Sequence, residues 1–477
     1  MSVPADREPV VAAPGYRPHY TTNRVRNALL SLAGVAVVVL ILFLVDGGAS
    51  IKLKQVVALF AIWGIATVSL NLVNGVTGIL SLGHHGFMLV GGYTTGLLIL
   101  PAATRDNLAA SARSNLSPFA IGLSVENMLR GLGLDALTTP ETLWVRFLIA
   151  LFIGGLVAAV FGVIVGFPSL RLRGDYLAIV TFAFGEAIRL LASTPMMSSF
   201  TNGALGFAGV PSDFGKSVWW TFGLLALTVF VMARLKFSSY GRVLMGIRED
   251  EIASEAMGVK TAYHKVLAFA ISAFFAGVAG GLWVSWVGTA RLDLFLFFLT
   301  FYFLVAISVG GTGSITGVLI GTALVVWVRQ YGDALENSYP LSTWAVAGGI
   351  VLVVVGLIAY WLRRTRRTRP VIGPAVYVPV VLGVGLALVG LFGGSIPLLQ
   401  DSWQGFGMRA ITLSLLLIAI MILRPSGVMG RREFSWAWLF RERIDEPTEE
   451  EKRQDAWLSN AAAGADAKDD DELEVKP

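Results

Sequence analysis

The chain has 477 residues, of which 55% are hydrophobic and only 14% are charged, and its apolar residues recur in runs of about 20, which indicates a polytopic membrane protein. The absence of cysteine excludes disulfides, thiolate chemistry and cysteine metal sites. The formal charge of +5 is modest and its basic residues lie between apolar runs, which argues against nucleic-acid binding.

Residues 1–27 contain several prolines and arginines and are predicted to be a disordered cytoplasmic lead. The apolar run from Ala28 to Val45 is long for a signal-peptide core and lacks a small-residue cleavage site, so we expect a retained first span. The fold class that follows is all-α, a polytopic transmembrane helical bundle of about twelve spans. The predicted spans lie near residues 28–45, 55–73, 76–100, 144–167, 176–192, 218–235, 266–288, 294–309, 316–330, 342–362, 375–394 and 409–423.

If the N-terminus is cytoplasmic and the chain has these twelve spans, the cytoplasmic segments between spans contain most of the lysines and arginines. This distribution agrees with the positive-inside rule. Both termini are therefore predicted to be cytoplasmic. The membrane domain is expected to cover 28–430, followed by an acidic, aromatic-poor cytoplasmic tail over 431–477. Two outer segments, 102–142 and 193–217, are too long to be simple turns, so each either closes the outer mouth, receives a partner or is a tolerated surface loop.

The stretch from Leu70 to Gly96 is so rich in glycine that an uninterrupted helix is not expected, since each glycine weakens a helix by about 1 kcal/mol relative to alanine. A broken or re-entrant helix beside the transport path is predicted instead. His84 is expected to be a hydrogen-bonded packing residue more readily than a titrating one. The candidate path residues here are Asn71, Ser81, His84 and Tyr93, and the structural glycines are Gly75, Gly78 and Gly83.

The stretch 171–189, RLRGDYLAIVTFAFGEAIR, places charges inside a predicted span. Asp175 suits a helix N-terminus, and Glu186 lies roughly 16 Å deeper, with Arg189 one turn beyond on the same face. Because intramembrane charges are costly, this pair should face protein or water. It is either an internal ion pair that locks two helices, which we favour, or a gate or contact for an amino acid zwitterion. The path candidates of this stretch are Asp175, Tyr176, Glu186 and Arg189.

The stretch from Ser238 to Lys265 is a charged island between two long apolar runs, yet it keeps an apolar stripe that a solvated linker would not need. Asp250 can cap a short helix and Gly258 can end it in the left-handed conformation. We predict an amphipathic helix at the membrane surface that docks onto another protein. The alternative is a solvated loop whose charges merely fix the topology.

Glycines also mark the connection from Val309 to Gly321, VGGTGSITGVLIG, which is predicted to be a tight turn between two spans. Its structural glycines are Gly310, Gly311 and Gly313. Gly-x-x-x-Gly spacings begin at Gly92, Gly162, Gly277 and Gly317, which together predict close-packed helices. The sequence FGKS at 214–217 lacks the first glycine of a phosphate-binding loop, and the chain has no HExxH motif, so neither ATP hydrolysis nor a metal site is predicted.

Several of these stretches carry one family resemblance. GRVLMGIREDEIASEAMG, 241–258, resembles the cytoplasmic coupling segment, or EAA loop, of permease subunits of ABC importers, in the form typical of branched-chain amino acid permeases. The stretch 70–96 resembles the family signature GLLSLGHAAFFGIGAY, with His85 where the family has alanine. The stretches 171–189, 309–321 and LRPSGVMG at 423–430 are similar to family segments as well. The resemblance covers 55–330 and 409–430 but omits 331–407, where an insertion adds two spans joined by an arginine-rich run, 363–369, that is expected to anchor at anionic head groups.

The resemblance implies a permease of the bacterial inner membrane that is not itself an enzyme and binds no cofactor, since ATP and Mg are used by partners. Those partners are two cytoplasmic ATPase subunits, a second homologous permease and an extracytoplasmic substrate-binding protein, besides membrane lipid. Coupling to the ATPase is assigned by resemblance to Arg242, Arg248, Glu249, Asp250, Glu255, Ala256 and Gly258. The implied substrates are branched-chain or related amino acids. A permease for urea or short-chain amides remains an alternative, as does an ion-coupled secondary transporter, for which Glu186 is the obvious deep carboxylate.

Overall fold

The computed structural model describes residues 24–111, 123–134, 139–169, 175–195, 197–331, 338–340, 402–404, 427–430 and 433, together with 382 and 384. The chain divides into two compact units, Leu44–Glu433 and the pair of terminal segments Met1–Phe43 and Phe434–Pro477. The larger unit contains every described element from α2 onward. The predicted spans 342–362, 375–394 and 409–423, the arginine run 363–369, and almost all of the predicted lead and tail lie outside the described residues.

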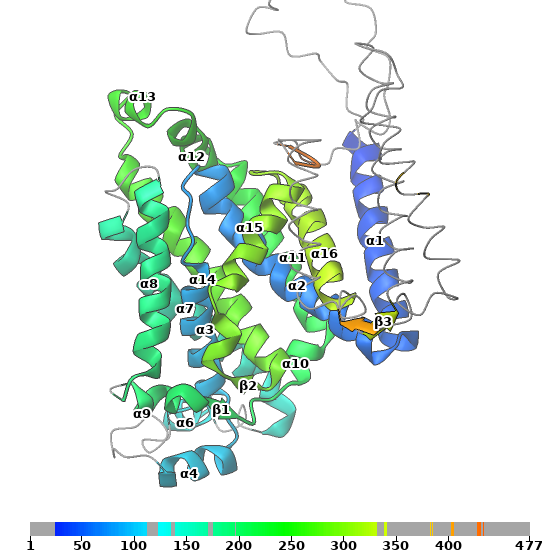
Figure 1. The fold of residues 1–477 in the computed structure, drawn as a ribbon, viewed down its shortest axis with the longest axis vertical. Coiled ribbons are helices and arrows are strands. Elements are labelled where there is room, and N and C mark those ends of the chain that lie inside the picture. Colours follow the sequence, from blue (N-terminus) through cyan, green and yellow to red (C-terminus); the bar gives the residue numbers. More distant parts are fainter. Residues whose placement is uncertain are drawn as a thin grey trace, which may run out of the picture. The chain divides into compact units, whose positions relative to one another are not determined.

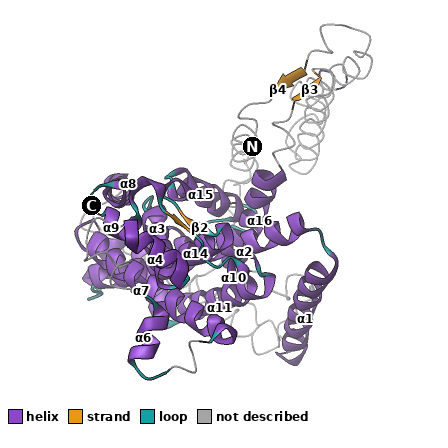
Figure 2. Cartoon of the chain, turned by 90° about the horizontal axis from the view of Figure 1, so that it is seen from below, coloured by secondary structure: helices purple, strands orange, loops and turns teal. Residues whose placement is uncertain are grey.

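Helices make up most of the described chain (Figures 1 and 2). The elements are α1 (Arg24–Gly48), α2 (Ile51–Asn71), the π-helix η1 (Leu72–Val76), α3 (His84–Leu98), α4 (Ala102–Ser111), α6 (Val125–Gly131), η3 (Pro140–Thr142), α7 (Leu143–Ser169), α8 (Asp175–Ser193), α9 (Ser198–Thr201), η4 (Gly203–Leu205), β1 (Phe207–Ala208), α10 (Asp213–Lys216), α11 (Val218–Lys236), α12 (Ser239–Glu249), α13 (Glu251–Ala256), α14 (Thr261–Val287), β2 (Thr289–Ala290), η5 (Leu292–Phe295), α15 (Phe298–Gly310), α16 (Ile315–Tyr331), β3 (Ser338–Pro340) and β4 (Ser402–Gln404).

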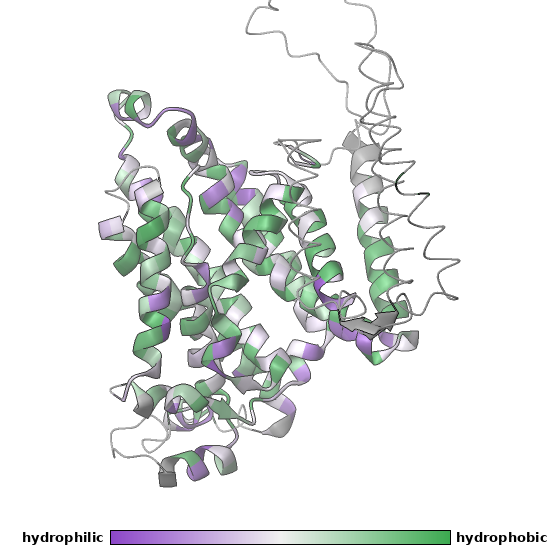
Figure 3. Cartoon of the chain, in the orientation of Figure 1, coloured by the Kyte–Doolittle hydropathy of each residue, from purple (hydrophilic) through white to green (hydrophobic). Residues whose placement is uncertain are grey.

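Within the described residues, seven helical segments are long and apolar enough to cross a membrane, and α3 with α4, bent by 108°, makes an eighth if the pair is counted as one span. The shorter apolar helix α16 adds a further candidate. Each of the nine spans predicted before residue 331 corresponds to one helix: α1, α2, α3, α7, α8, α11, α14, α15 or α16. The polytopic helical fold is therefore confirmed, with hydrophobic residues along the helices and hydrophilic ones at the α12–α13 connection and on α4 (Figure 3).

Helix α14 lies at the centre of the larger unit and packs against α7, α3 and α2, while α2 also contacts α11 and α16. Glycine lets these helices approach closely. A Cβ at Gly277 of α14 would lie only 2.6 Å from the Cβ of Ala158 on α7, and one at Gly162 would lie 2.6 Å from the Cβ of Ala273. The close packing predicted from the Gly-x-x-x-Gly spacings is confirmed at these positions, because residues with side chains would push the helices apart.

The glycine-rich stretch breaks the helix as predicted. The chain leaves α2 through η1 and runs from Thr77 to Gly83 without helical structure before α3 begins at His84. Side chains satisfy this irregular backbone: Asn74 Oδ1 accepts the Ser81 N–H at 3.0 Å, and Thr181 Oγ1 of α8 accepts the Leu82 N–H at 3.1 Å. Irregular backbone at membrane depth thus persists here because neighbouring protein replaces the missing helical hydrogen bonds.

The long segment 193–217 lies at the end of the bundle opposite α13 (Figure 1). Its strand β1 pairs antiparallel with β2, so that Phe207 faces Ala290 in the register. The FGKS sequence forms α10, where Phe214 stacks on Phe147 with ring centroids 4.4 Å apart and Gly215 N–H donates to Ser285 Oγ at 3.1 Å. These residues pack the loop onto α7 and α14.

Strands β3 and β4 lie near the two ends of the predicted insertion 331–407. They pair antiparallel, with Tyr339 opposite Trp403 in the register. The beginning and the end of the insertion are therefore joined to each other.

Candidate functional site

The charged island between α11 and α14 forms two short helices, α12 and α13, at one end of the bundle (Figure 1). Ser238 Oγ accepts the Gly241 N–H at 3.3 Å and caps α12, while Asp250 Oδ1 accepts the Ala253 N–H at 3.0 Å and caps α13. Gly258, with φ of 83°, takes the left-handed conformation after α13. The predicted cap and stop of the amphipathic helix are confirmed, and α12 precedes it as a second helix.

The apolar stripe of the island is divided between the two helices. Leu244 and Ile247 of α12 are buried in the bundle, but α13 has no buried residue, and its flanking apolar side chains Ile252 and Met257 are 67% and 84% exposed. The predicted coupling residues Glu249, Asp250, Glu255 and Ala256 are exposed around them. Helix α12 therefore anchors the segment, and α13 presents an uncovered apolar face with an acidic surround.

Two side chains tie α13 to the start of α14. Glu251 Oε1 pairs with Lys265 Nζ at 2.5 Å, and Glu255 Oε1 accepts a hydrogen bond from Thr261 Oγ1 at 2.7 Å. The side chain of Tyr240 on α12 makes a third tie, donating to the carbonyl oxygen of His264 at 2.8 Å, and burial raises the pKa of this phenol. Short polar contacts therefore connect α12 and α13 to the first turns of α14.

Arg248 reaches from α12 into the bundle. Its Nη1 donates to the carbonyl oxygen of Gly75 in η1, and its aliphatic stem packs on Gly78, where an added Cβ would lie 2.6 Å from Arg248 Cγ. The coupling role assigned to Arg248 by resemblance stays a prediction, and the structure shows that Arg248 holds α12 to the break between α2 and α3. Gly78 is the close-approach position that this contact requires, whereas Gly75 makes room for Asn71 and Gly313, since a Cβ there would lie 2.0 Å from Asn71 Oδ1 and 2.4 Å from the Gly313 nitrogen.

We call the residues Asn71, Lys236, Gly313 and Glu433 the turn cluster, because they meet at the α15–α16 turn beside Arg248. Asn71 Oδ1 accepts the Gly313 N–H at 2.8 Å, and Lys236 Nζ donates to the Gly313 carbonyl oxygen at 2.7 Å. Glu433 pairs with Lys236 at 2.5 Å. The cluster joins the end of α2, the end of α11 and the α15–α16 turn to the chain after the last predicted span.

Glu433 was not a sequence candidate, and it makes the most contacts of this cluster. Its Oε1 accepts the Ile315 N–H at 2.7 Å and its Oε2 accepts the Thr316 N–H at 3.1 Å, so the carboxylate caps the N-terminus of α16. Burial by itself would raise the pKa of Glu433, but the hydrogen bond from Lys236 and those from the two backbone N–H groups outweigh burial and hold it below its ordinary value. The only sequence signal for this capping role is that a carboxylate follows shortly after LRPSGVMG. That signal does not indicate which residues the carboxylate contacts.

The residues just before Glu433 are held against the end of α15 by backbone hydrogen bonds. Val428 N–H donates to the Val309 carbonyl oxygen at 2.9 Å and Met429 N–H to that of Gly310 at 3.0 Å. Side chains at Gly310 and Gly311 would collide with Gly317 and with Gly430, respectively. The predicted structural glycines of this turn are therefore points where two backbones touch.

A second polar group, inside the bundle, joins α3 to α8. Arg189 Nε donates to Glu186 Oε2 at 2.8 Å, as the sequence predicted, and Glu186 Oε1 lies 3.4 Å from Nε2 of His85. His85 is fully buried, with its Nδ1 3.0 Å from Thr300 Oγ1, while Glu186 is 17% exposed. The charged residues face protein, as the cost of an intramembrane charge requires. Gly83 contacts the Thr181 backbone of α8 beside them.

The remaining path candidates have different surroundings in the described part of the chain. His84 is buried and Nε2 lies 3.1 Å from Ser69 Oγ, which is the packing role favoured from sequence. Ser81 is buried against Asn74, and Tyr93 is buried between Phe207 and Phe295. Tyr176 is exposed on α8, whose first residue is Asp175. Their roles in transport stay predictions. Among the described residues, no group of three or more His, Asp or Glu is placed to hold a metal ion.

Comparison with known proteins covers the predicted family segments up to 330 and, unlike the resemblance seen in the sequence, also includes the beginning of the predicted insertion 331–407. The profile of the family described as "Branched-chain amino acid transport system / permease component" matches residues 53–356. The LivM high-affinity branched-chain amino acid permease protein of Salmonella typhimurium is 29% identical over 365 residues, covering 70% of this chain and 74% of the relative. The probable LivM protein of Methanocaldococcus jannaschii is 26% identical, covering 60% and 82%, and the fructose import permease FruF of Bifidobacterium longum is 25% identical, covering 45% and 63%. No solved structure matches the chain significantly.

Proposed function

The chain belongs to the family of branched-chain amino acid transport permease components, and from that membership we propose that it forms part of the membrane pathway of an ATP-driven importer of branched-chain or related amino acids. ATP and Mg are used by separate ATPase subunits. This chain contributes the path and the contact that makes the path respond to ATP hydrolysis.

The observation that carries the proposal is the contrast between α13 and its surroundings. The apolar face of α13 is uncovered, while Glu251, Glu255 and Arg248 fix both sides of the segment to the bundle. A short amphipathic helix held in this way is suited to docking into a groove of another protein. Movement of the docked partner then passes through α14 and through Arg248 to the break between α2 and α3.

The assembly that fits this function contains two cytoplasmic ATPase subunits, a second homologous permease and an extracytoplasmic substrate-binding protein. The α13 end of the bundle then faces the cytoplasm, as do both termini, and about twelve spans cross the membrane. The concentration of Arg234, Lys236, Arg242, Arg248, Lys260 and Lys265 at the α13 end supports this orientation. The loop 193–217, at the opposite end, is available to the binding protein.

The docking role is tested by placing charges on the α13 face. The double substitution Ile252→Asp and Met257→Asp should abolish retention of the ATPase subunits and reduce uptake at least tenfold, because burying an unpaired polar group costs about 2 kcal/mol or more. Uptake and co-purification of the ATPase are the measurements. Leu132→Asp, a similarly exposed site at the opposite end, is the control and should behave as the parent. Normal ATPase retention by the double variant would refute the docking role.

Two alternatives differ in the energy source or in the substrate. An ion-coupled secondary transporter would need a deep carboxylate free to bind the ion, but Glu186 is paired with Arg189, whose Nε and Nη2 both lie 2.8 Å from Glu186 Oε2. Uptake that resists vanadate would favour that alternative. Competition among leucine, urea and fructose in the reconstituted complex separates an amino acid permease from an amide permease and from a sugar permease like the FruF relative.

A further inference from the structure

Helix α11 presents an apolar stripe to the outside of the bundle. Its buried side chains, including Leu225 and Met232, lie on the face towards α2, with which α11 packs. The exposed positions recur at helical spacing on the other face, and they are Trp219, Gly223, Leu227, Phe230, Arg234 and Phe237. The stripe is about 27 Å long at 1.5 Å per residue, close to the thickness of a bilayer's hydrocarbon core.

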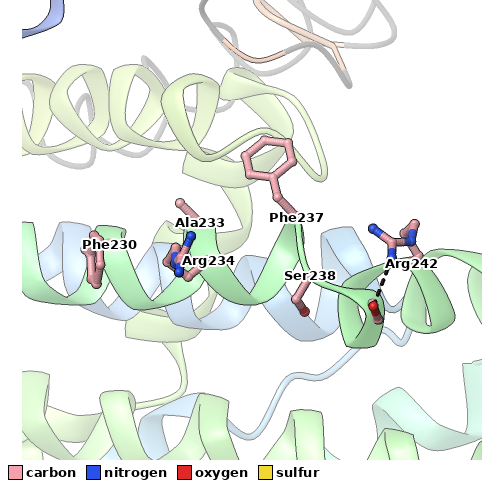
Figure 4. Close-up of a pocket in the computed structure, with 7 residues that line it drawn as sticks. Phe230, Ala233, Arg234, Phe237, Ser238 and Arg242 are labelled. Carbon is pink, nitrogen blue, oxygen red and sulfur yellow. Dashed lines mark hydrogen bonds between the residues drawn. The ribbon is translucent and has the colours of Figure 1, made fainter. Parts of the chain in front are cut away.

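At the α12 end of this stripe is a cavity of about 660 Å³ (Figure 4). It lies at the joint between α11 and α12 and is lined by Phe230, Arg234, Phe237, Ser238, Ser239 and Arg242. The side chains of Phe230 and Arg234 come from the last turns of α11, and that of Arg242 comes from the first turn of α12. The cavity is therefore apolar towards the stripe and cationic towards the α13 end.

The polar lining suits a phosphate group. Arg242 Nη2 donates to Ser239 Oγ at 2.9 Å, which holds this guanidinium over the cavity (Figure 4). The neighbouring base Lys236 is engaged by Glu433 and does not line the cavity, and no Asp or Glu is among the described residues that do. Two guanidinium groups with adjacent hydroxyls, and with no carboxylate among the described lining residues, favour a phosphate ester through paired N–H···O contacts.

The opposite end of the stripe has a matching feature. A second cavity, of about 310 Å³, is lined by Trp219, Trp220, Gly223 and Leu224. Tryptophan at this level is typical of a membrane–water interface, and the cavity's lining is apolar. The exposed face of α11 thus carries tryptophan at one end, apolar side chains along its length and Arg234 near the α12 end.

We infer that the Arg234–Arg242 cavity binds the phosphate head group of an anionic phospholipid in the leaflet on the α13 side, with an acyl chain lying along Leu227 and Phe230. A lipid is favoured over an acidic protein segment because the cationic cavity continues into an apolar stripe of bilayer length. The bound head group bridges α11 and α12, so the lipid holds the joint from which the α12–α13 segment extends. The lipid site depends on this geometry and does not depend on the identity of the transported substrate.

The site is tested by lipid retention. The full-length chain, purified in mild detergent with the subunits that accompany it, is incubated with phosphatidylglycerol or phosphatidylcholine and examined by native mass spectrometry. We expect the parent to retain phosphatidylglycerol selectively, and the double variant Arg234→Gln, Arg242→Gln to lose roughly tenfold or more of that retention. Lys216→Gln, which removes one charge at the other end of α11, is the matched control and should retain lipid as the parent does.

A second measurement uses the unaltered chain and so does not depend on the folding of a variant. A phosphatidylglycerol analogue with a photoreactive group near the phosphate should cross-link to the peptide containing 230–242, and excess phosphatidylglycerol should prevent the cross-link. Displacement of the lipid by millimolar inorganic phosphate would show a site for a soluble anion and overturn the proposal. Equal retention by the parent and the arginine variant, or cross-linking of the lipid analogue only to peptides outside 230–242, would overturn it as well.

Discussion

Glu433 shows how one carboxylate can hold together elements that are far apart in the sequence. It neutralises Lys236, whose side chain is only 9% exposed, and it caps the first turn of α16 through two backbone N–H groups. An anion is stabilised at a helix N-terminus, where the first N–H groups lack partners within the helix. The same contacts fix Gly313, which Asn71 and Arg248 approach from the other side.

Replacing Glu433 by glutamine should destabilise the α13 end of the bundle. The neutral amide leaves the ammonium of Lys236 without its counter-charge, which should cost about 1–3 kcal/mol. We expect a lower midpoint in thermal unfolding at pH 7, followed by tryptophan fluorescence. Asp106→Asn, an exposed acid on α4, serves as the control and should leave the midpoint unchanged. An unaltered midpoint for the Glu433 variant would contradict the structural role.

The loss of stability in the Glu433→Gln variant should depend on pH. Because the pKa of Glu433 is lower in the folded protein than its ordinary value of 4.5, its stabilisation is fully present above 4.5 and is lost as the pH falls through the folded-state pKa. The gap in unfolding midpoint between the parent and Glu433→Gln should therefore be constant from pH 8 to 6 and shrink below about 4.5.

His85 is a residue whose neighbours only the fold reveals. The family signature that this stretch resembles has alanine at this position, and no partner for the imidazole can be inferred from the sequence. In the structure, the break before α3 brings His85 beside Glu186 and Thr300, which belong to two other helices. The larger side chain thus adds a polar contact to the Glu186–Arg189 pair.

At the scale of elements, glycine has two separate effects in this chain. Between 70 and 83 it allows the helix to break, and the break is stabilised by side chains from other elements. In α14 it leaves the helix intact and lets the backbones of α3 and α7 approach. Within lipid, the hydrophobic effect does not drive helices together. Close packing at glycines provides the van der Waals contacts that hold these helices against each other instead.

The packing role predicts opposite results for two glycines inside long helices. Gly277→Val should lower the thermal unfolding midpoint by an amount corresponding to about 1–3 kcal/mol, because its Cβ would press on Ala158, 2.6 Å away, and on the backbone of α7. Gly223→Ala on α11 has nothing within 4 Å of the new Cβ and should be neutral or slightly stabilising. Equal effects of the two substitutions would show that close packing at Gly277 is not required.

At the scale of the whole molecule, contacts at the α13 end bring together residues from the first and last parts of the larger unit. Asn71, Arg248, Gly313 and Glu433 meet there, although they span more than 350 positions of a 477-residue sequence. Helix α12, which carries Arg248, connects this meeting point to α13 and its proposed docking face. A partner bound to α13 therefore acts on the side of the bundle where the long-range connections converge.

The proposed orientation can be checked with single cysteines, because the natural chain has none. Cysteine in place of Met257 on the α13 side should react with a membrane-impermeant maleimide only after the cells are opened, when the chain is expressed without its partners. Cysteine in place of Leu132, at the opposite end, should react in intact cells whose outer membrane is permeable. Labelling of the Met257 variant in intact cells would reverse the orientation and remove the basis for cytoplasmic docking.

The sequence by itself determined the class of the protein and its local structure. Apolar run length predicted the helices α1 to α16 that could span a membrane, glycine density predicted the break before α3, and Asp250 and Gly258 predicted the limits of α13. These features depend on residues close together in the chain, so local pattern is sufficient to find them. The predicted spans beyond 340 lie outside the described residues and stay predictions.

Only the tertiary structure decided which polar groups meet. It turned Arg248 towards Gly75, brought Glu433 to Lys236 and α16, and placed His85 beside Glu186. It also placed Arg234 and Arg242, which belong to different helices, around one cavity. Hydrogen bonds and ion pairs act over about 3 Å, and separation along the chain carries no information about such distances until the helices have packed.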